Sequence, residues 1–152
     1  MSLIYSFYTN KINQFYKLSN SLTKYLCIPF EAGGRDYQGI DCFGLVKLIY
    51  KEFLDINIPD TEKLPGNIVG IQNELKNFSN LFIKVKDPEP FDIILCRESP
   101  SSKNINHIAL FLTSGKGIHA VEGQGVVVEK FIRNPYYLEM IEGYYRYNDQ
   151  SN

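Results

Sequence analysis

The sequence contains few cysteines, few histidines and no tryptophan, and these scarcities exclude several kinds of site. Its three cysteines, Cys27, Cys42 and Cys96, are widely spaced along the chain. An odd set without a close pair fits neither a disulfide framework nor a zinc site of the Cys-x-x-Cys kind. We therefore expect free thiols in a reducing compartment.

The sequence also lacks a charge excess, a long apolar run and an export signal. The formal net charge is -1 at pH 7, and the lysines and arginines are spread along the chain. This pattern argues against nucleic acid as the main partner, because phosphate binding needs clustered basic residues. No window approaches the roughly 18 apolar residues of a transmembrane helix. Residues 1–16 lack the features of a secretory signal, so we expect a protein made in the cytoplasm and not exported by that route.

What the sequence does contain is typical of one globular domain. The 152 residues are 44% apolar and 22% charged, which predicts a single domain over residues 1–152 with a substantial core. Aromatic residues are abundant, with eleven tyrosines and ten phenylalanines. Most of them should fill the core and the surface of a sheet.

Apolar spacing predicts helices in the first half of the chain. Residues 10–26 carry an apolar stripe, with Asn10 as the candidate N-cap. A second helix should run from Cys42 to about residue 54. Its buried face would hold Leu45, Val46, Ile49 and Phe53. Prolines and glycines then predict an irregular connection over residues 57–70, followed or overlapped by a short helix within residues 68–78.

The second half of the chain changes to short runs rich in Ile, Val and Phe, separated by Pro, Gly, Ser and Asn. These runs predict strands at residues 81–85, 92–96, 107–112, 118–121, 126–131 and 143–147. Helices followed by strands indicate an α+β domain with an antiparallel sheet.

Cys42 stands at the predicted start of the second helix. Asp41, directly before it, is a good N-cap, because its carboxylate can accept hydrogen bonds from the free amides of the first turn. The partial positive charge of a helix N-terminus favours the thiolate, and a nearby histidine would help by taking the proton. The alternative is that Cys42 is a small buried apolar residue, which is the usual fate of an isolated cysteine.

Both histidines of the chain fall within one predicted hairpin. If residues 113–115 form its loop, Ala109 faces His119, and His107 is the diagonal neighbour of His119 on the same face. A register shifted by one residue would place the two rings on opposite faces.

A cysteine nucleophile requires a base and a third group that orients the base. Cys42, His107 and His119 could supply these roles in that order. Two alternatives remain: the histidines have no functional partner, or the same three residues bind zinc. The zinc site is less favoured, because neither histidine lies beside another ligand at a typical metal spacing.

Four motifs, in this order and spacing, resemble the NlpC family of cysteine peptidases. They are PFEAGGRD at residues 29–36, GIDCFGLV at 39–46, NHIALFL at 106–112 and GIHA at 117–120. The resemblance covers residues from about 25 to 147. Within the family, the Gly-Gly-Arg-Asp loop and the Asp-Cys-Phe-Gly form are similar to members encoded with phage tail genes.

The resemblance implies a papain-like α+β fold, with the cysteine helix packed on an antiparallel sheet. It also implies hydrolysis of peptidoglycan stem peptides or muropeptides, typically between D-glutamate and a diamino acid, without a metal or cofactor. Cys42 would be the nucleophile, His107 the base and His119 the third residue. The Cys42 amide, at a helix start capped by Asp41, would be an oxyanion donor.

Two positions depart from the family pattern. Many members have a tyrosine twelve residues before the cysteine, where this chain has Phe30, so a hydroxyl that serves oxyanion stabilisation or substrate positioning is absent. Phe43 replaces the usual serine and would narrow the site. The loop charges of Glu31, Arg35 and Asp36 are weaker candidates for contacts with a charged peptide.

These observations lead to one main hypothesis and three alternatives. The main hypothesis is a peptidoglycan endopeptidase that a phage or phage-derived particle carries to the wall, with phage tail proteins as partners. The alternatives are a cytoplasmic hydrolase of wall fragments, a catalytically weak structural or binding module of a tail tip, and an amidase or acyltransferase. The last shares the acyl-enzyme step with hydrolysis, so the sequence does not separate the two.

Overall fold

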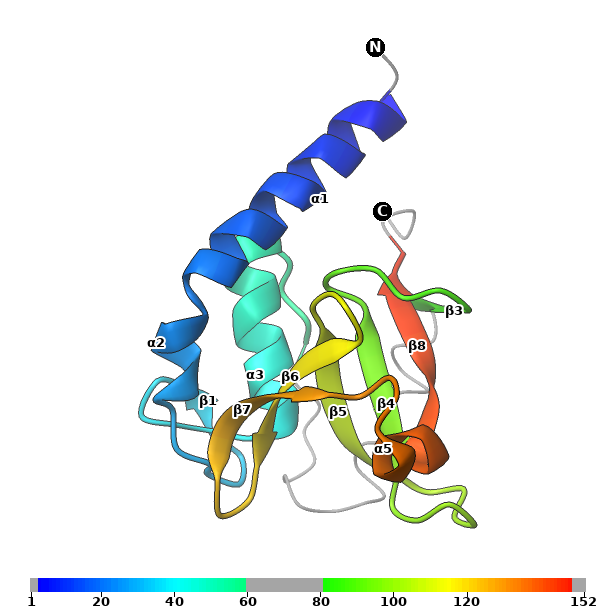
Figure 1. Cartoon of the computed structure of the whole chain (residues 1–152). Coiled ribbons are helices and arrows are strands. Elements are labelled where there is room, and N and C mark those ends of the chain that lie inside the picture. Colours follow the sequence, from blue (N-terminus) through cyan, green and yellow to red (C-terminus); the bar gives the residue numbers. More distant parts are fainter. Residues whose placement is uncertain (1–2, 60–80, 149–152) are drawn as a thin grey trace.

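Helices and strands occupy separate parts of the fold (Figure 1). The computed structural model describes residues 3–59 and 81–148. Helices from the first half of the chain lie on one side of a six-stranded antiparallel sheet built by the second half. This is the α+β arrangement that the order of helix and strand patterns predicted.

The first helical segment begins earlier than predicted and is broken near its end. Helix α1 spans Leu3–Asn20 and α2 spans Leu22–Leu26, so Asn10 lies inside a helix and the prediction that it is the N-cap is wrong. Residues 3–9 contain no proline or glycine that would stop the helix. At the break, the Ser21 amide donates to the Leu18 carbonyl at 2.9 Å, an i to i−3 bond that tightens the last turn.

The second predicted helix is confirmed, with a change of hydrogen-bonding pattern towards its end. Helix α3 spans Cys42–Ile49 and continues directly into the π-helical segment η1, Tyr50–Leu54. The segment ends at Asp55, whose φ is 55°. The hydroxyl of Tyr50 donates to the carbonyl oxygen of Phe91 at 2.6 Å and ties the helix to the sheet. In the described part of the chain, no helix has the length and apolar character needed to cross a membrane.

All six predicted strands are present, with ends that move by no more than two residues. They are β3 (Phe82–Val85), β4 (Ile93–Arg97), β5 (Ile105–Phe111), β6 (Lys116–Val121), β7 (Gly125–Lys130) and β8 (Ile141–Tyr147). Their order in the sheet is β3-β8-β4-β5-β6-β7. The hairpin β5–β6 that carries both histidines therefore lies towards one side of the sheet, next to β7.

Three small elements were not predicted. Strands β1 (Arg35–Asp36) and β2 (Gly39–Ile40) form a short ribbon before α3. Helix α5 (Pro135–Met140) starts from the cap Asn134 and has no buried residue, so its sequence has no apolar stripe to reveal it. The short helix predicted within residues 68–78 lies outside the described residues.

Apolar side chains cover both faces of the sheet. One core cluster lies between the sheet and the helices and includes Leu45, Val46, Leu95, Leu110 and Ile118. A smaller cluster holds Ile94, Cys96, Ala109, Phe111 and Phe131. Neighbouring residues of β4 and β5 alternate between the two clusters, as expected when successive side chains of a strand point to opposite faces. Both faces of the central strands are therefore buried.

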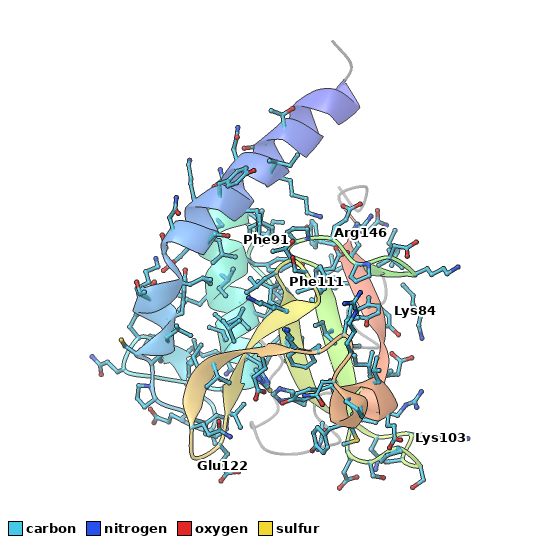
Figure 2. The ribbon with its side chains drawn as sticks, viewed as in Figure 1. Lys84, Phe91, Lys103, Phe111, Glu122 and Arg146 are labelled. Atoms are coloured by element: carbon cyan, nitrogen blue, oxygen red, sulfur yellow. The ribbon has the colours of Figure 1, made fainter. Side chains whose placement is uncertain are left out.

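A buried ion pair joins the start of β4 to β8. The carboxylate of Asp92 is buried and accepts hydrogen bonds from Nη2 and Nε of Arg146 at 2.8 and 3.0 Å. The guanidinium of Arg146 compensates the buried charge of Asp92. Figure 2 shows Phe91 and Arg146 at one end of the sheet, and Lys103 and Glu122 at the opposite end.

Candidate active site

The start of α3 is capped as the sequence predicted. The buried carboxylate of Asp41 accepts from the Gly44 amide at 2.7 Å and from the Gly33 amide at 3.0 Å. Its Oδ1 atom also lies 2.7 Å from Nη1 of Arg35. One carboxylate therefore satisfies the helix start and ties the preceding loop to it.

Glycines allow this loop to approach the helix closely. Gly33 has a φ of 80°, a conformation that residues with a Cβ rarely adopt. A Cβ on Gly44 would overlap the carbonyl oxygen of Gly34. The Gly-Gly-Arg loop and the Asp-Cys-Phe-Gly sequence are therefore complementary parts of one structure, which fixes the position of Cys42.

The thiol of Cys42 is not ionised in the resting protein. Cys42 retains some exposed surface, but burial of the thiol, with a further contribution from the Asp41 carboxylate, raises its pKa to about 11. The backbone amides of Ile108, Phe43 and Cys42 act in the opposite direction. The amides at the helix start act in the predicted direction, but burial and a neighbouring negative charge outweigh them, so the net shift of the Cys42 pKa is upward.

The two histidines are hydrogen-bonded to each other. Strands β5 and β6 pair with Leu110 opposite Ile118, which is the predicted register of the hairpin. Nε2 of His107 lies 2.7 Å from Nδ1 of His119. The predicted diagonal arrangement on one face is confirmed.

The Cys42 side chain contacts the backbone of β5, the strand that carries His107. Its sulfur has the Ile108 amide among its partners, and Ile108 directly follows His107 in the chain. Helix α3 packs against both β5 and β6. The structure therefore brings the capped cysteine to the strand segment that carries the first histidine.

Burial keeps both rings neutral. It lowers the pKa of His107 to about 3, and the neighbouring His119 adds to this effect. Burial also lowers the pKa of His119, although the hydrogen bond and charge of Glu129 partly offset the change. A neutral imidazole is the form that a general base needs, because it can take a proton as a thiol attacks.

Sequence reasoning missed two residues next to the histidines. Nε2 of His119 lies 2.8 Å from Oε2 of Glu129, and the Tyr137 hydroxyl donates to the same oxygen. A register for the β6–β7 hairpin would have revealed Glu129, since Val127 is the partner of His119 and Glu129 lies two residues further along the same face. Tyr137 lies on α5, a six-residue helix that the apolar pattern did not indicate.

The two phenylalanines that replace family residues both lie near the loop and the start of α3. Phe30 forms an isolated bridge with Ile40 and packs against the main core. Phe43 is buried, and the guanidinium of Arg35 lies 5.5 Å from its ring centroid. Both side chains contribute apolar surface where a hydroxyl was expected from the family pattern.

The three charged loop residues have contacts within the protein. Arg35 pairs with Asp41 and also donates to the Gly34 carbonyl at 2.8 Å. Asp36 accepts from the backbone amide of Gln38 at 2.8 Å. The backbone of Glu31 bonds to β2 and to the Gly-Gly turn. These contacts shape the loop.

Metal binding has no support in the described part of the chain. Within residues 3–59 and 81–148, no group of three His, Cys, Asp or Glu side chains is arranged to hold a metal ion. The zinc alternative raised by the sequence therefore has no ligand set among these residues.

One protein-family profile matches most of the chain, including the candidate active site. The profile of the NlpC/P60 family matches residues 28–146, which include Cys42 and both histidines. The chain belongs to the NlpC/P60 family. NlpC/P60 domains are cysteine peptidases of cell-wall hydrolases. A search of curated proteins gave no significant match.

Solved NlpC/P60 structures share the fold. An NlpC/P60 family protein from Bacillus cereus has a TM-score of 0.67 and 23% identity over 88% of this chain and 40% of that one. NlpC2 from Trichomonas vaginalis has a TM-score of 0.60 and 23% identity, covering 91% of this chain and 47% of that one. The NlpC/p60 domain of the peptidoglycan hydrolase SagA has a TM-score of 0.51 and 24% identity, covering 80% and 87%. The NlpC/P60 domain described here thus spans well under half of the Bacillus protein.

Proposed function

We propose that this NlpC/P60 domain is a peptidoglycan endopeptidase that uses Cys42, His107 and His119. The observation that carries the proposal is the 2.7 Å contact between the two imidazoles, on the strand segment that Cys42 approaches. A base with a hydrogen-bonded orienting group is what a cysteine nucleophile requires. Family membership supports a cell-wall peptide as the substrate class.

The proposed reaction has two steps. In the first, Nδ1 of His107 takes the thiol proton as the Cys42 sulfur attacks the substrate carbonyl. The carbonyl oxygen becomes an oxyanion, for which the Cys42 amide is the proposed donor. His107 then protonates the leaving amine, the C–N bond breaks, and a thioester remains on Cys42.

In the second step, His107 takes a proton from water as the water oxygen attacks the thioester. The proton returns to the departing sulfur, which releases the carboxylic acid and restores the thiol. His119 keeps the ring of His107 in place throughout, because its Nδ1 accepts a hydrogen bond from Nε2 of His107. No metal or other cofactor is required.

The bond between D-glutamate and a diamino acid is the proposed point of cleavage. Glu31, Arg35 and Asp36 are proposed to meet the charged groups of the stem peptide at the edge of the site. Phe30 and Phe43 add apolar surface where family members have hydroxyls, which favours a narrower site and fewer polar contacts to the substrate. We expect these two residues to tune rate and substrate choice rather than to remove activity.

The setting of the enzyme is part of the proposal. We infer that the protein reaches the wall as part of a phage or phage-derived particle, with tail proteins as partners. The Gly-Gly-Arg-Asp and Asp-Cys-Phe-Gly sequences support this setting through their resemblance to tail-associated members. A hydrolase of wall fragments in the cytoplasm has the same chemistry and is the alternative setting.

The test is incubation with purified muropeptides, followed by mass analysis of the fragments. The wild-type protein should release fragments that end at D-glutamate. Cys42→Ala and His107→Ala should release none, whereas Cys27→Ser, which changes an exposed thiol, should match the wild type. Full activity of Cys42→Ala would contradict the proposal.

A second candidate is a structural or binding module of a tail tip with weak catalysis. Two observations favour it: the raised pKa of the Cys42 thiol and the absence of a hydroxyl at Phe30. It predicts binding of stem peptides without release of fragments on the time scale of the muropeptide assay. An amidase or acyltransferase would differ again, by transferring the acyl group to an added amine.

A further inference from the structure

The histidine pair continues into two residues that the proposed reaction does not use. Glu129 on β7 lies 2.8 Å from Nε2 of His119, and the hydroxyl of Tyr137 on α5 donates to the same carboxylate oxygen. His107, His119, Glu129 and Tyr137 therefore form one continuous chain of hydrogen bonds. The chain runs from the proposed base to a half-exposed carboxylate, whose side chain is 39% exposed.

The charge of Glu129 decides which nitrogen of each ring carries a hydrogen. The hydrogen bond from Tyr137, together with the bond and charge of His119, lowers the pKa of Glu129, so it is ionised at neutral pH. An ionised carboxylate only accepts hydrogen bonds. Nε2 of His119 must therefore carry a hydrogen. Because His119 is neutral, its Nδ1 is bare and accepts from Nε2 of His107.

The same reasoning extends to the proposed base. His107 is also neutral, and its single ring hydrogen is on Nε2, where it is donated to His119. Its Nδ1 is therefore the bare nitrogen. Without a fixed acceptor at the far end, His119 could carry its hydrogen on Nδ1 and donate to His107. Nδ1 of His107 would then be protonated and unable to take a proton from Cys42.

We propose that Glu129, held by Tyr137, is a positioning residue that fixes the tautomers of His119 and His107, so that Nδ1 of His107 is free to accept the thiol proton. This inference rests on the peptidase function proposed above. It adds two residues to the machinery, and neither of them touches the substrate or the sulfur.

The other described side chains around His119 do not accept a hydrogen bond from its Nε2, so Glu129 sets its tautomer. The rings of Phe131 and Tyr137 stand edge-on to the imidazole, with centroids 5.0 and 6.0 Å away, and they hold its plane without accepting from Nε2. Within residues 3–59 and 81–148, the titratable groups that face His119 are His107 from β5, Glu129 from β7 and Tyr137 from α5, and Cys96 of β4 lies near Tyr137. Among the described residues, Glu129 is the carboxylate bonded to this ring.

Long-range proton–nitrogen NMR of the histidine rings tests the proposal, because it reports which nitrogen of each ring is protonated. In the wild type both rings should be protonated on Nε2. In Glu129→Ala, His119 and His107 should show mixed or Nδ1-protonated forms. The kcat for stem peptides should fall about 10-fold to 100-fold, with little change in KM. Losses of this size, about 10-fold to 100-fold, are typical when a residue that orients a metal-bound histidine through a hydrogen bond is removed.

Two further variants sharpen the test. Tyr137→Phe removes only the hydroxyl that holds the carboxylate, so it should give a smaller loss of kcat in the same direction. It also keeps the test possible if Glu129→Ala does not fold. Glu139→Gln is the control, because it removes one carboxylate charge, as Glu129→Ala does, but at an exposed position of α5. It should leave the tautomers of both histidines and kcat unchanged.

Two results would overturn the inference: an Nδ1-protonated His107 in the wild type, or wild-type tautomers and kcat in both Glu129→Ala and Tyr137→Phe. A failure of the peptidase proposal has a different signature. The wild type would then leave wall peptides intact, while the NMR spectra would still report the tautomers of both rings.

Discussion

Removal of the Asp41 carboxylate should destabilise the domain and disturb the site together. In Asp41→Ala, α3 loses its N-cap, which is worth about 1 kcal/mol. The Gly33 amide also loses its acceptor in a partly buried position, at a cost of about 1–3 kcal/mol. The ion pair to Arg35 adds little, because the Arg35 side chain is 31% exposed. The sum is a loss of about 2–4 kcal/mol in the free energy of unfolding, a large share of the ~5–15 kcal/mol of a typical domain.

Urea unfolding measures this loss. With a slope of about 2 kcal/mol per molar urea, the middle of the range for small domains, the midpoint should fall by about 1–2 M. Asp41→Asn keeps one acceptor oxygen and should lose less; it should also lower the pKa of the Cys42 thiol, since the Asp41 charge raises it. Asp36→Ala is the control, because its carboxylate accepts one exposed amide. Equal midpoints for Asp41→Ala and Asp36→Ala would refute the assignment of Asp41 as the cap.

Three further predictions concern the same site. Gly44→Ala should push the loop away from α3, because the added Cβ overlaps the Gly34 carbonyl; it should lower both the urea midpoint and peptide cleavage, and an unchanged midpoint would contradict the close packing. Alkylation of Cys42, measured with the other two cysteines replaced by serine, should keep accelerating above pH 9, because burial and then Asp41 raise the thiol pKa to about 11; a plateau below pH 7 would show a preformed thiolate. Burial lowers the pKa of His107 to about 3, whereas an unfolded chain takes up this proton near pH 6.5. The contribution of neutral His107 to the free energy of unfolding is therefore complete above about pH 6.5 and is lost as the pH falls towards 3. The loss of free energy of unfolding in acid should be smaller in His107→Gln than in the wild type.

The sequence predicted the histidine pair because a short hairpin loop fixes the register of its strands. Once residues 113–115 form the loop, His107 and His119 must share a face, and the observed pairing of Leu110 with Ile118 is in that register. The cap was equally predictable, because Asp41 acts on amides only a few residues away. Local rules were sufficient for both features.

Other features depend on how distant segments pack, and local rules did not reveal them. The pKa of the Cys42 thiol is raised by burial and by Asp41, whereas the sequence pattern indicated a helix N-terminus and a nearby histidine, both of which favour the thiolate. Tyr137 reaches Glu129 from a six-residue helix with no buried side chain. The extension of α1 towards Leu3 was missed because the apolar stripe was clear only from Asn10 onwards.

A covalent acyl-enzyme on Cys42 is the most direct test of the central claim. The protein would be mixed briefly with a stem peptide, quenched in acid, and analysed by intact-protein mass spectrometry with peptide mapping. A mass increase equal to the acyl half of the substrate should appear on the peptide that contains Cys42 and should be absent from Cys42→Ala. Fragment release with no adduct on any cysteine, and at the wild-type rate in Cys42→Ala, would contradict the role of Cys42 as the nucleophile.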